Sequence, residues 1–154
     1  MEDIIESDIF KEALSDSING LHNENILQLS SDKIYQYKQN ILNELNLDNA
    51  KRDKMEESLK EYRYIDDIND FTLGEYIRWI NIVKDEELTL SRGAFITDIA
   101  IYNEDVCIKC KICCKYPNNR TIHLQIRGGE NIIFQKLSTQ EKIILSALDY
   151  INKK

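Results

Sequence analysis

The sequence predicts an α+β fold: N-terminal helices including an αα-hairpin, then an antiparallel β-meander, then a C-terminal capping helix. Apolar residues recur at helical spacing in residues 1–64. Short runs of β-branched and aromatic residues, separated by turn-forming residues, occupy 74–136. A capped apolar stripe follows at 138–152. We expect these three parts to form a single domain over residues 1–154, which is long enough to bury a core.

Three helices are expected in the first part. The first is indicated by apolar residues before Gly20, namely Ile5, Ile9, Leu14 and Ile18. The second begins at the N-cap oxygens of Ser31 and Asp32, and its apolar stripe is Ile34, Tyr37, Ile41, Leu42 and Leu45. Asp48 can cap the third, which is expected to run through Met55, Leu59 and Tyr62. The short link between the second and third helices predicts an αα-hairpin.

The strands are expected to follow one another with short connections, as in an antiparallel meander that can curl into a partial SH3-like barrel. The expected strands are Tyr76 to Val83, Leu88 to Leu90, Ala94 to Tyr102, Cys107 to Tyr116, Thr121 to Arg127 and Asn131 to Lys136. In the third of these, Phe95, Ile99 and Ile101 are expected to share a face. Gly128 and Gly129 are typical of a hairpin turn joining the last two strands.

The last helix carries the clearest local signal. Ser138 and Glu141 form a capping box, in which each side chain can bond to the other residue's backbone N–H. The buried stripe of this helix is expected to be Ile144, Ala147, Leu148 and Ile151. We expect this stripe to cover the open face of the meander.

Charge is unevenly distributed along the chain. The net charge is −7, but residues 1–106 hold 11 basic and 24 acidic residues, whereas residues 107–136 hold six basic and one acidic. Such asymmetry indicates either an anionic partner or attraction between the two parts of the chain.

All four cysteines lie between Cys107 and Cys114, which makes a metal site the first hypothesis to weigh. In an extended strand, Cys107 and Cys110 point to opposite faces and lie about 10 Å apart. Zinc ligands at about 2.3 Å from the metal need their sulfurs much closer together. We therefore expect no metal at Cys107, Cys110, Cys113 and Cys114, and no cofactor. Cys110 and Cys114 are expected to be core residues, and Cys107 and Cys113 exposed or partly covered thiols.

The same segment, as a strand, has one apolar and one basic face. Pairing it with the next strand by hydrophobic fit places Tyr116 opposite Ile122 and Ile112 opposite Ile126, or a shift of one pair, so that Lys109 or Lys111 faces Arg127. Like charges directly opposed are destabilising and call for an anion. The predicted binding residues are Lys109, Lys111, Lys115, His123, Gln125 and Arg127.

Three ligands could supply that anion: an acidic partner protein, the chain's own acidic helices, or nucleic acid. Aromatic residues that would stack on bases are not expected on this face, which favours the first two. After binding of a protein and binding of nucleic acid, the third hypothesis for the function is a zinc-dependent module built on the cysteine segment. The chain is not expected to be an enzyme, because its two histidines and scattered carboxylates form no catalytic motif. Self-association through the N-terminal helices is also open.

No apolar run approaches the roughly 18 residues that span a membrane, and the first residues are acidic, unlike a secretory signal. We expect a soluble, intracellular protein with reduced thiols and no membrane partner. The segments Gly74 to Ile80, Phe134 to Ser138 and Ala147 to Tyr150 resemble small, uncharacterised proteins of nucleocytoplasmic large DNA viruses. The resemblance implies a viral protein in the host cytoplasm or nucleus, or packaged in the virion.

Overall fold

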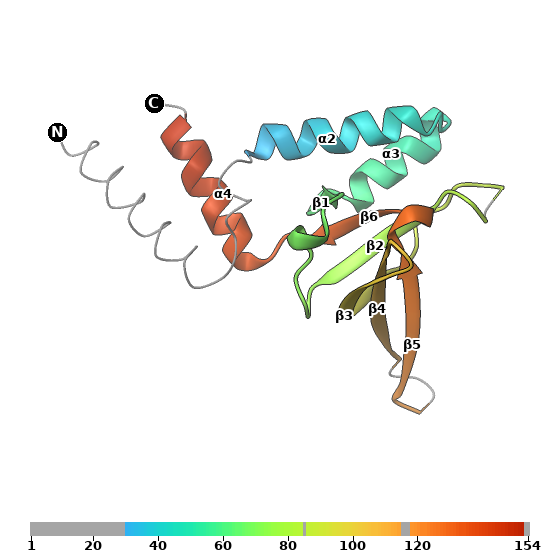
Figure 1. Ribbon diagram of the computed structural model, residues 1–154. Helices are drawn as coiled ribbons and strands as arrows, with labels where there is room; N and C mark the ends of the chain where they lie inside the picture. The colour runs from blue at the N-terminus through green and yellow to red at the C-terminus, as the bar shows by residue number, and fades with distance from the viewer. Residues whose placement is uncertain (1–29, 85, 115–117, 153–154) are drawn as a thin grey trace. The chain divides into compact units, whose positions relative to one another are not determined.

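The structure, a computed structural model, describes residues 30–152 except residue 85 and residues 115–117. Its helices are α2 (Ser31–Glu44), α3 (Asn49–Ser58) and α4 (Thr139–Asn152), with short 3-10 helices η2 (Ile68–Asp70) and η3 (Gly128–Glu130). Its strands are β1 (Tyr62–Ile65), β2 (Tyr76–Asn81), β3 (Ala94–Tyr102), β4 (Asp105–Cys114), β5 (Arg120–Arg127) and β6 (Asn131–Lys136) (Figure 1). The predicted α+β class is confirmed. The helix expected over Ile5 to Ile18 lies outside the described residues.

The described residues divide into two compact units, one of residues 30–36 and 137–152 and the other of residues 37–136. In the first unit, Ile144 and Leu145 of α4 pack with Ile34 at the start of α2. The expected stripe of α4 is confirmed, since Ala147, Leu148 and Ile151 pack against this cluster. The role of α4 as a cover for the meander stays a prediction, as does the single domain.

Both helix starts in this unit are capped by side chains. The capping box is confirmed: the backbone N–H of Glu141 donates to Ser138 Oγ at 3.0 Å, and that of Ser138 donates to Glu141 Oε1 at 3.2 Å. At α2 the cap is Ser30, whose Oγ accepts from the backbone N–H of Lys33 at 3.2 Å. The expected cap at Ser31 is wrong, because the Ser31 hydroxyl instead donates to Asp149 at 2.5 Å.

In the second unit, the predicted αα-hairpin is confirmed, and Asp48 caps α3 by accepting from the backbone N–H of Lys51 at 2.9 Å. The hairpin's buried residues, Leu42, Met55 and Leu59, form a cluster with Ile80 of β2 and Phe134 of β6. The part of the apolar stripe formed by Ile41, Leu42 and Leu45 is therefore covered by the chain's own sheet. Self-association through these helices stays a prediction.

Two details of the hairpin differ from expectation. On α2, Tyr37 was expected in the buried stripe but is exposed, whereas the neighbouring Lys38 is buried. Lys38 Nζ is satisfied there by donating to the carbonyl oxygen of Leu59 at 2.9 Å. This burial lowers the pKa of Lys38. On α3 the helix ends at Ser58, and Tyr62 begins β1 instead of continuing the helix. The first strand is therefore β1, and not the segment from Tyr76.

The six strands form one antiparallel sheet in the order β1-β6-β2-β3-β4-β5. Strands β2 to β5 are a meander, as predicted. The predicted hairpin turn at Gly128 and Gly129 is wrong, since these residues belong to η3 and β6 pairs with β1 and β2 instead of β5. The Asp105 carboxylate holds η3, the connection between β5 and β6, in place, because it accepts a hydrogen bond from the Gly129 N–H at 3.0 Å.

The sheet is strongly curved. Strands β2 to β6 all contribute to one core cluster, formed by Ile77, Ala94, Ile96, Ile108, Cys110, Ile126 and Ile133. In the strand order, β5 is separated from β2 by two strands, so their side chains can share a cluster only if the sheet bends toward itself. Figure 1 shows β5 crossing near β2. The sheet therefore has the form of a partial barrel.

Two strand predictions need correction. The segment Leu88 to Leu90 is not a strand but makes a single bridge, between Leu90 and Ile80. On β3 the register shifts between Ile96 and Asp98, so that Phe95 lies on the opposite face from Ile99. The expected common face for Phe95, Ile99 and Ile101 is therefore wrong.

Candidate binding face and adjoining pocket

The pairing of β4 with β5 decides which side chains meet. Lys109 lies opposite Gln125, Lys111 opposite His123, and Cys107 opposite Arg127. The predicted register is wrong in both of its versions, and so is the opposition of a lysine to Arg127. Ile126 pairs with Ile108, so the pairing is displaced toward the N-terminal end of β4 relative to the prediction.

The predicted binding residues nevertheless share one face of the sheet. Because side chains at every second position point the same way, the outer face of β4 and β5 carries Lys109, Lys111, His123, Gln125 and Arg127, all of them exposed. We call these five residues the basic face. Lys115, predicted with them, lies outside the described residues.

Strand β3 adds two residues that the sequence did not place on this face. Asp98 lies directly opposite Lys109, and Phe95 lies directly opposite Lys111. Phe95 is 40% exposed, and its ring meets that of Tyr76 edge-on with centroids 5.0 Å apart. The expectation of no aromatic residue on this face is therefore wrong. The bulge in β3 is the cause, since one extra residue reverses the side to which the preceding residues point.

The cations of the basic face are poorly compensated. Within the described part of the chain, no carboxylate oxygen lies within 4.0 Å of a side-chain nitrogen of Lys109, Lys111 or Arg127. Asp98 is the nearest candidate by register, and one of its carboxylate oxygens accepts from the backbone N–H of Ile99 at 2.9 Å. This surface can therefore still bind an anion.

The cysteines are free thiols on both faces of β4. Cys110 is buried in the core and Cys113 is exposed, as expected. Cys107, expected to be exposed or partly covered, is buried with 4% exposure, close to where η3 contacts the start of β4 at Val106. Over residues 30–152, with the gaps already given, no group of three or more His, Cys, Asp or Glu side chains could hold a metal ion.

Burial raises the pKa of the Cys110 thiol from 9.0 to about 11. Between these values the unfolded chain has lost a proton that the folded protein keeps, so the contribution of Cys110 to stability is full below pH 9 and lost as the pH rises toward 11. We expect the difference in unfolding free energy between the native protein and Cys110→Ala to narrow over this range in urea titrations.

The comparison of the native protein with Cys110→Ala isolates the titration of one thiol. Burial also raises the pKa of Tyr62 and Tyr64, but both tyrosines are present in both proteins and their contributions cancel. A difference in unfolding free energy that stays constant or widens from pH 9 to 11 would contradict burial of the Cys110 thiol.

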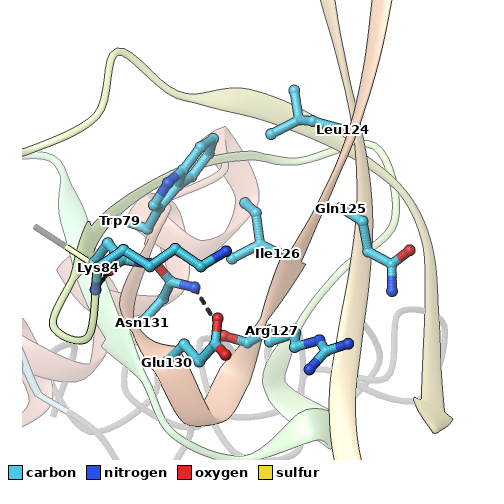
Figure 2. Close-up of a pocket in the computed structure, with 9 residues that line it drawn as sticks. Trp79, Lys84, Leu124, Gln125, Ile126, Arg127, Glu130 and Asn131 are labelled. Atoms are coloured by element: carbon cyan, nitrogen blue, oxygen red, sulfur yellow. Dashed lines mark hydrogen bonds between the residues drawn. The ribbon is translucent and has the colours of Figure 1, made fainter.

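A pocket of about 270 Å³ adjoins the basic face, at the end of β5. It is lined by Trp79, Asn81, Lys84, Leu124, Gln125, Ile126, Arg127, Glu130 and Asn131. Figure 2 shows Leu124 and Ile126 on the side of β5 that faces Trp79, with Lys84 extending toward Ile126 and with Gln125 and Arg127 on the other side of the strand. An amide hydrogen bond of 3.2 Å, from Asn81 to Asn131, joins β2 to β6 at its base.

The pocket was not foreseen from the sequence. Its wall residues Trp79 and Leu124 come from strands far apart in the chain and meet only because the sheet curves. Both residues carry ordinary core patterns in their own strands, so neither segment holds a local signal for a cavity.

Comparison with known protein families, with curated proteins and with solved structures finds no match to this chain. Among the described helices, none is long and apolar enough to cross a membrane.

Proposed function

We propose that this chain is a non-enzymatic interaction protein that binds an acidic segment of a partner protein through its basic face. The observation that carries the proposal is the set of exposed cations at Lys109, Lys111 and Arg127, none of which has an ion-pair partner among the described residues. Paired strands hold the three side chains at fixed spacing, which reduces the entropy lost on binding. The resemblance to proteins of large DNA viruses makes the cytoplasm or nucleus of an infected cell the expected setting.

The proposal is tested by reversing the charge of the face. In the triple variant Lys109→Glu, Lys111→Glu and Arg127→Glu, we expect the affinity for an oligoglutamate peptide to fall about tenfold or more. Each exposed ion pair is worth about 0.2–1 kcal/mol, and reversal adds repulsion to the loss of attraction. Isothermal titration calorimetry at an ionic strength of about 0.15 M, where the Debye length is about 8 Å, measures the change.

A matched control separates the position of the charges from their number. Lys54, Lys60 and Lys136 are also exposed and lie on other elements. Changing these three to glutamate brings the net charge from −7 to −13, as the first triple variant does. We expect the control to bind within about threefold of the native protein, because distant exposed charges are screened by salt. Equal losses in both triple variants would refute the basic face as the binding surface.

A second candidate ligand is single-stranded nucleic acid, favoured by the position of Phe95 beside Lys111. An exposed aromatic ring next to cations is the arrangement on which bases stack. Against it stand the net charge of −7 and the carboxylate of Asp98 on the same face. Binding of an oligothymidylate to the same variants decides between the two ligands. Tight binding to this DNA, with no binding to oligoglutamate, would identify nucleic acid and not an acidic protein as the ligand of the basic face.

A further inference from the structure

The free edge of β5 offers unpaired backbone groups between an apolar inner face and a basic outer face, an arrangement that suits an extended peptide. Among the described strands, β5 is the last in the sheet and its one partner is β4. Half of its backbone N–H and C=O groups therefore point away from the sheet, where a further strand could pair with them. No sequence motif marks this edge; it follows from the order of the strands.

The pocket opens on this edge. Its lining includes four consecutive residues of β5, of which Leu124 and Ile126 belong to the inner face and Gln125 and Arg127 to the outer face. Residues of both faces can line a single cavity only along the edge of the strand. At about 270 Å³ the cavity is smaller than the roughly 300–1,000 Å³ of typical small-molecule sites, so it suits one or two side chains of a peptide.

The two sides of the edge differ in character. On the inner side, Trp79, Leu124 and Ile126 offer an apolar wall. On the outer side, Arg127 and the two lysines of β4 offer positive charge. Lys84 and Glu130 also line the pocket, and their opposite formal charges offset each other. The apolar wall therefore favours an apolar side chain placed against it.

We propose that the partner's segment binds as a seventh strand along β5, with alternating residues that are acidic on the outer face and apolar on the inner face. In a strand added about 4.8 Å from β5, every second side chain lies on the outer face, beside Arg127 and within reach of Lys109 and Lys111. The side chains between them point to the inner face, and one enters the pocket against Trp79. The main chain supplies affinity and the alternation supplies specificity. This inference rests on the proposed function and specifies the partner's sequence pattern and conformation.

The probe is a capped peptide of alternating glutamate and valine, as long as the eight residues of β5. Trp79 is the chain's single tryptophan, so its fluorescence reports directly on the pocket. We expect the peptide to bind and to change this fluorescence. An oligoglutamate peptide of equal length is expected to bind more weakly and to leave the fluorescence unchanged.

Backbone methylation of the peptide tests strand pairing without altering the protein. One peptide is N-methylated at every glutamate and another at every valine, because the N–H groups of these two sets point to opposite edges of a strand. We expect one of the two peptides to lose about tenfold or more in affinity, since its facing N–H groups can no longer donate, and the other to bind within about twofold of the parent.

Protein variants test the pocket. Leu124→Glu places a charge in the apolar wall and is expected to weaken binding of the alternating peptide about tenfold or more. Ile101→Glu is the matched control, because Ile101 is an apolar residue of β3 that is 66% exposed and neither lies on β5 nor lines the pocket. Should Leu124→Glu fail to fold, the methylated peptides still decide the question.

The outcomes separate the inference from the proposed function. If both methylated peptides bind equally, strand addition is overturned, while binding that depends on the basic face leaves the proposed function standing. If oligoglutamate binds and the alternating peptide does not, the inference fails alone. If neither acidic peptide binds, both fail.

Discussion

Replacing Phe134 by alanine is expected to lower the free energy of unfolding by about 3–5 kcal/mol, the usual range for deleting a buried phenylalanine ring. Phe134 is fully buried on β6, between β1 and β2, in the cluster that joins the helical hairpin to the sheet. Its ring packs on that of Tyr64 with centroids 6.0 Å apart. Domains are stable by only about 5–15 kcal/mol, so this loss is a large share of the total.

Urea denaturation followed by circular dichroism measures the effect. The matched control is Tyr102→Ala, which removes an aromatic ring that is 66% exposed and should change stability by less than about 0.5 kcal/mol. If the two variants lost the same stability, Phe134 would not hold the hairpin to the sheet.

The second large effect is expected at Gly93, which precedes β3. Its φ of +104° is a conformation that favours glycine, and a Cβ there would lie 2.5 Å from Cε1 of Tyr76 and 2.6 Å from the carbonyl oxygen of Ile77. The Tyr76 hydroxyl donates to the carbonyl oxygen of Arg92 at 2.6 Å, so the ring cannot turn aside without losing that bond. Gly93→Ala should therefore cost roughly 2–5 kcal/mol, from the dihedral cost and the overpacking together.

Gly74→Ala is the control, because Gly74 also has a positive φ, of +88°, but an added Cβ would meet nothing within 4 Å. It should show the dihedral cost alone, about 1–2 kcal/mol. Thermal denaturation of both variants separates the two contributions. Equal losses at Gly93 and Gly74 would show that β3 does not approach Tyr76 and Ile77 as closely as described.

The elements that depend on local signals were predictable. The hairpin of α2 and α3, the Asp48 cap and the capping box of α4 each rest on residues within one turn of one another. Strand β1 was missed for the opposite reason. Met55, Leu59 and Tyr62 continue a helical spacing, and Tyr62 becomes a strand residue only because it pairs with Lys136 of β6. Non-local pairing overrides local pattern in strands.

The composition of the basic face was predictable from the alternation along β4 and β5, but its neighbours were not. The hydrophobic pattern fixes which side of each strand faces the core, and it leaves the pairing free to slide in steps of two residues. That freedom produced the wrong partner for Arg127. The bulge in β3 has no local signal either, and it moved Phe95 from the expected core face to a place beside Lys111.

The proposed function rests on the uncompensated cations of β4 and β5, so the most direct measurement locates a bound acidic peptide on the protein. Backbone amide chemical shifts of isotope-labelled protein are recorded by NMR during titration with oligoglutamate. We expect the largest chemical-shift changes at Lys109, Lys111, Gln125 and Arg127. Chemical-shift changes confined to α2 and α3, with β4 and β5 unaffected, would contradict the proposed function.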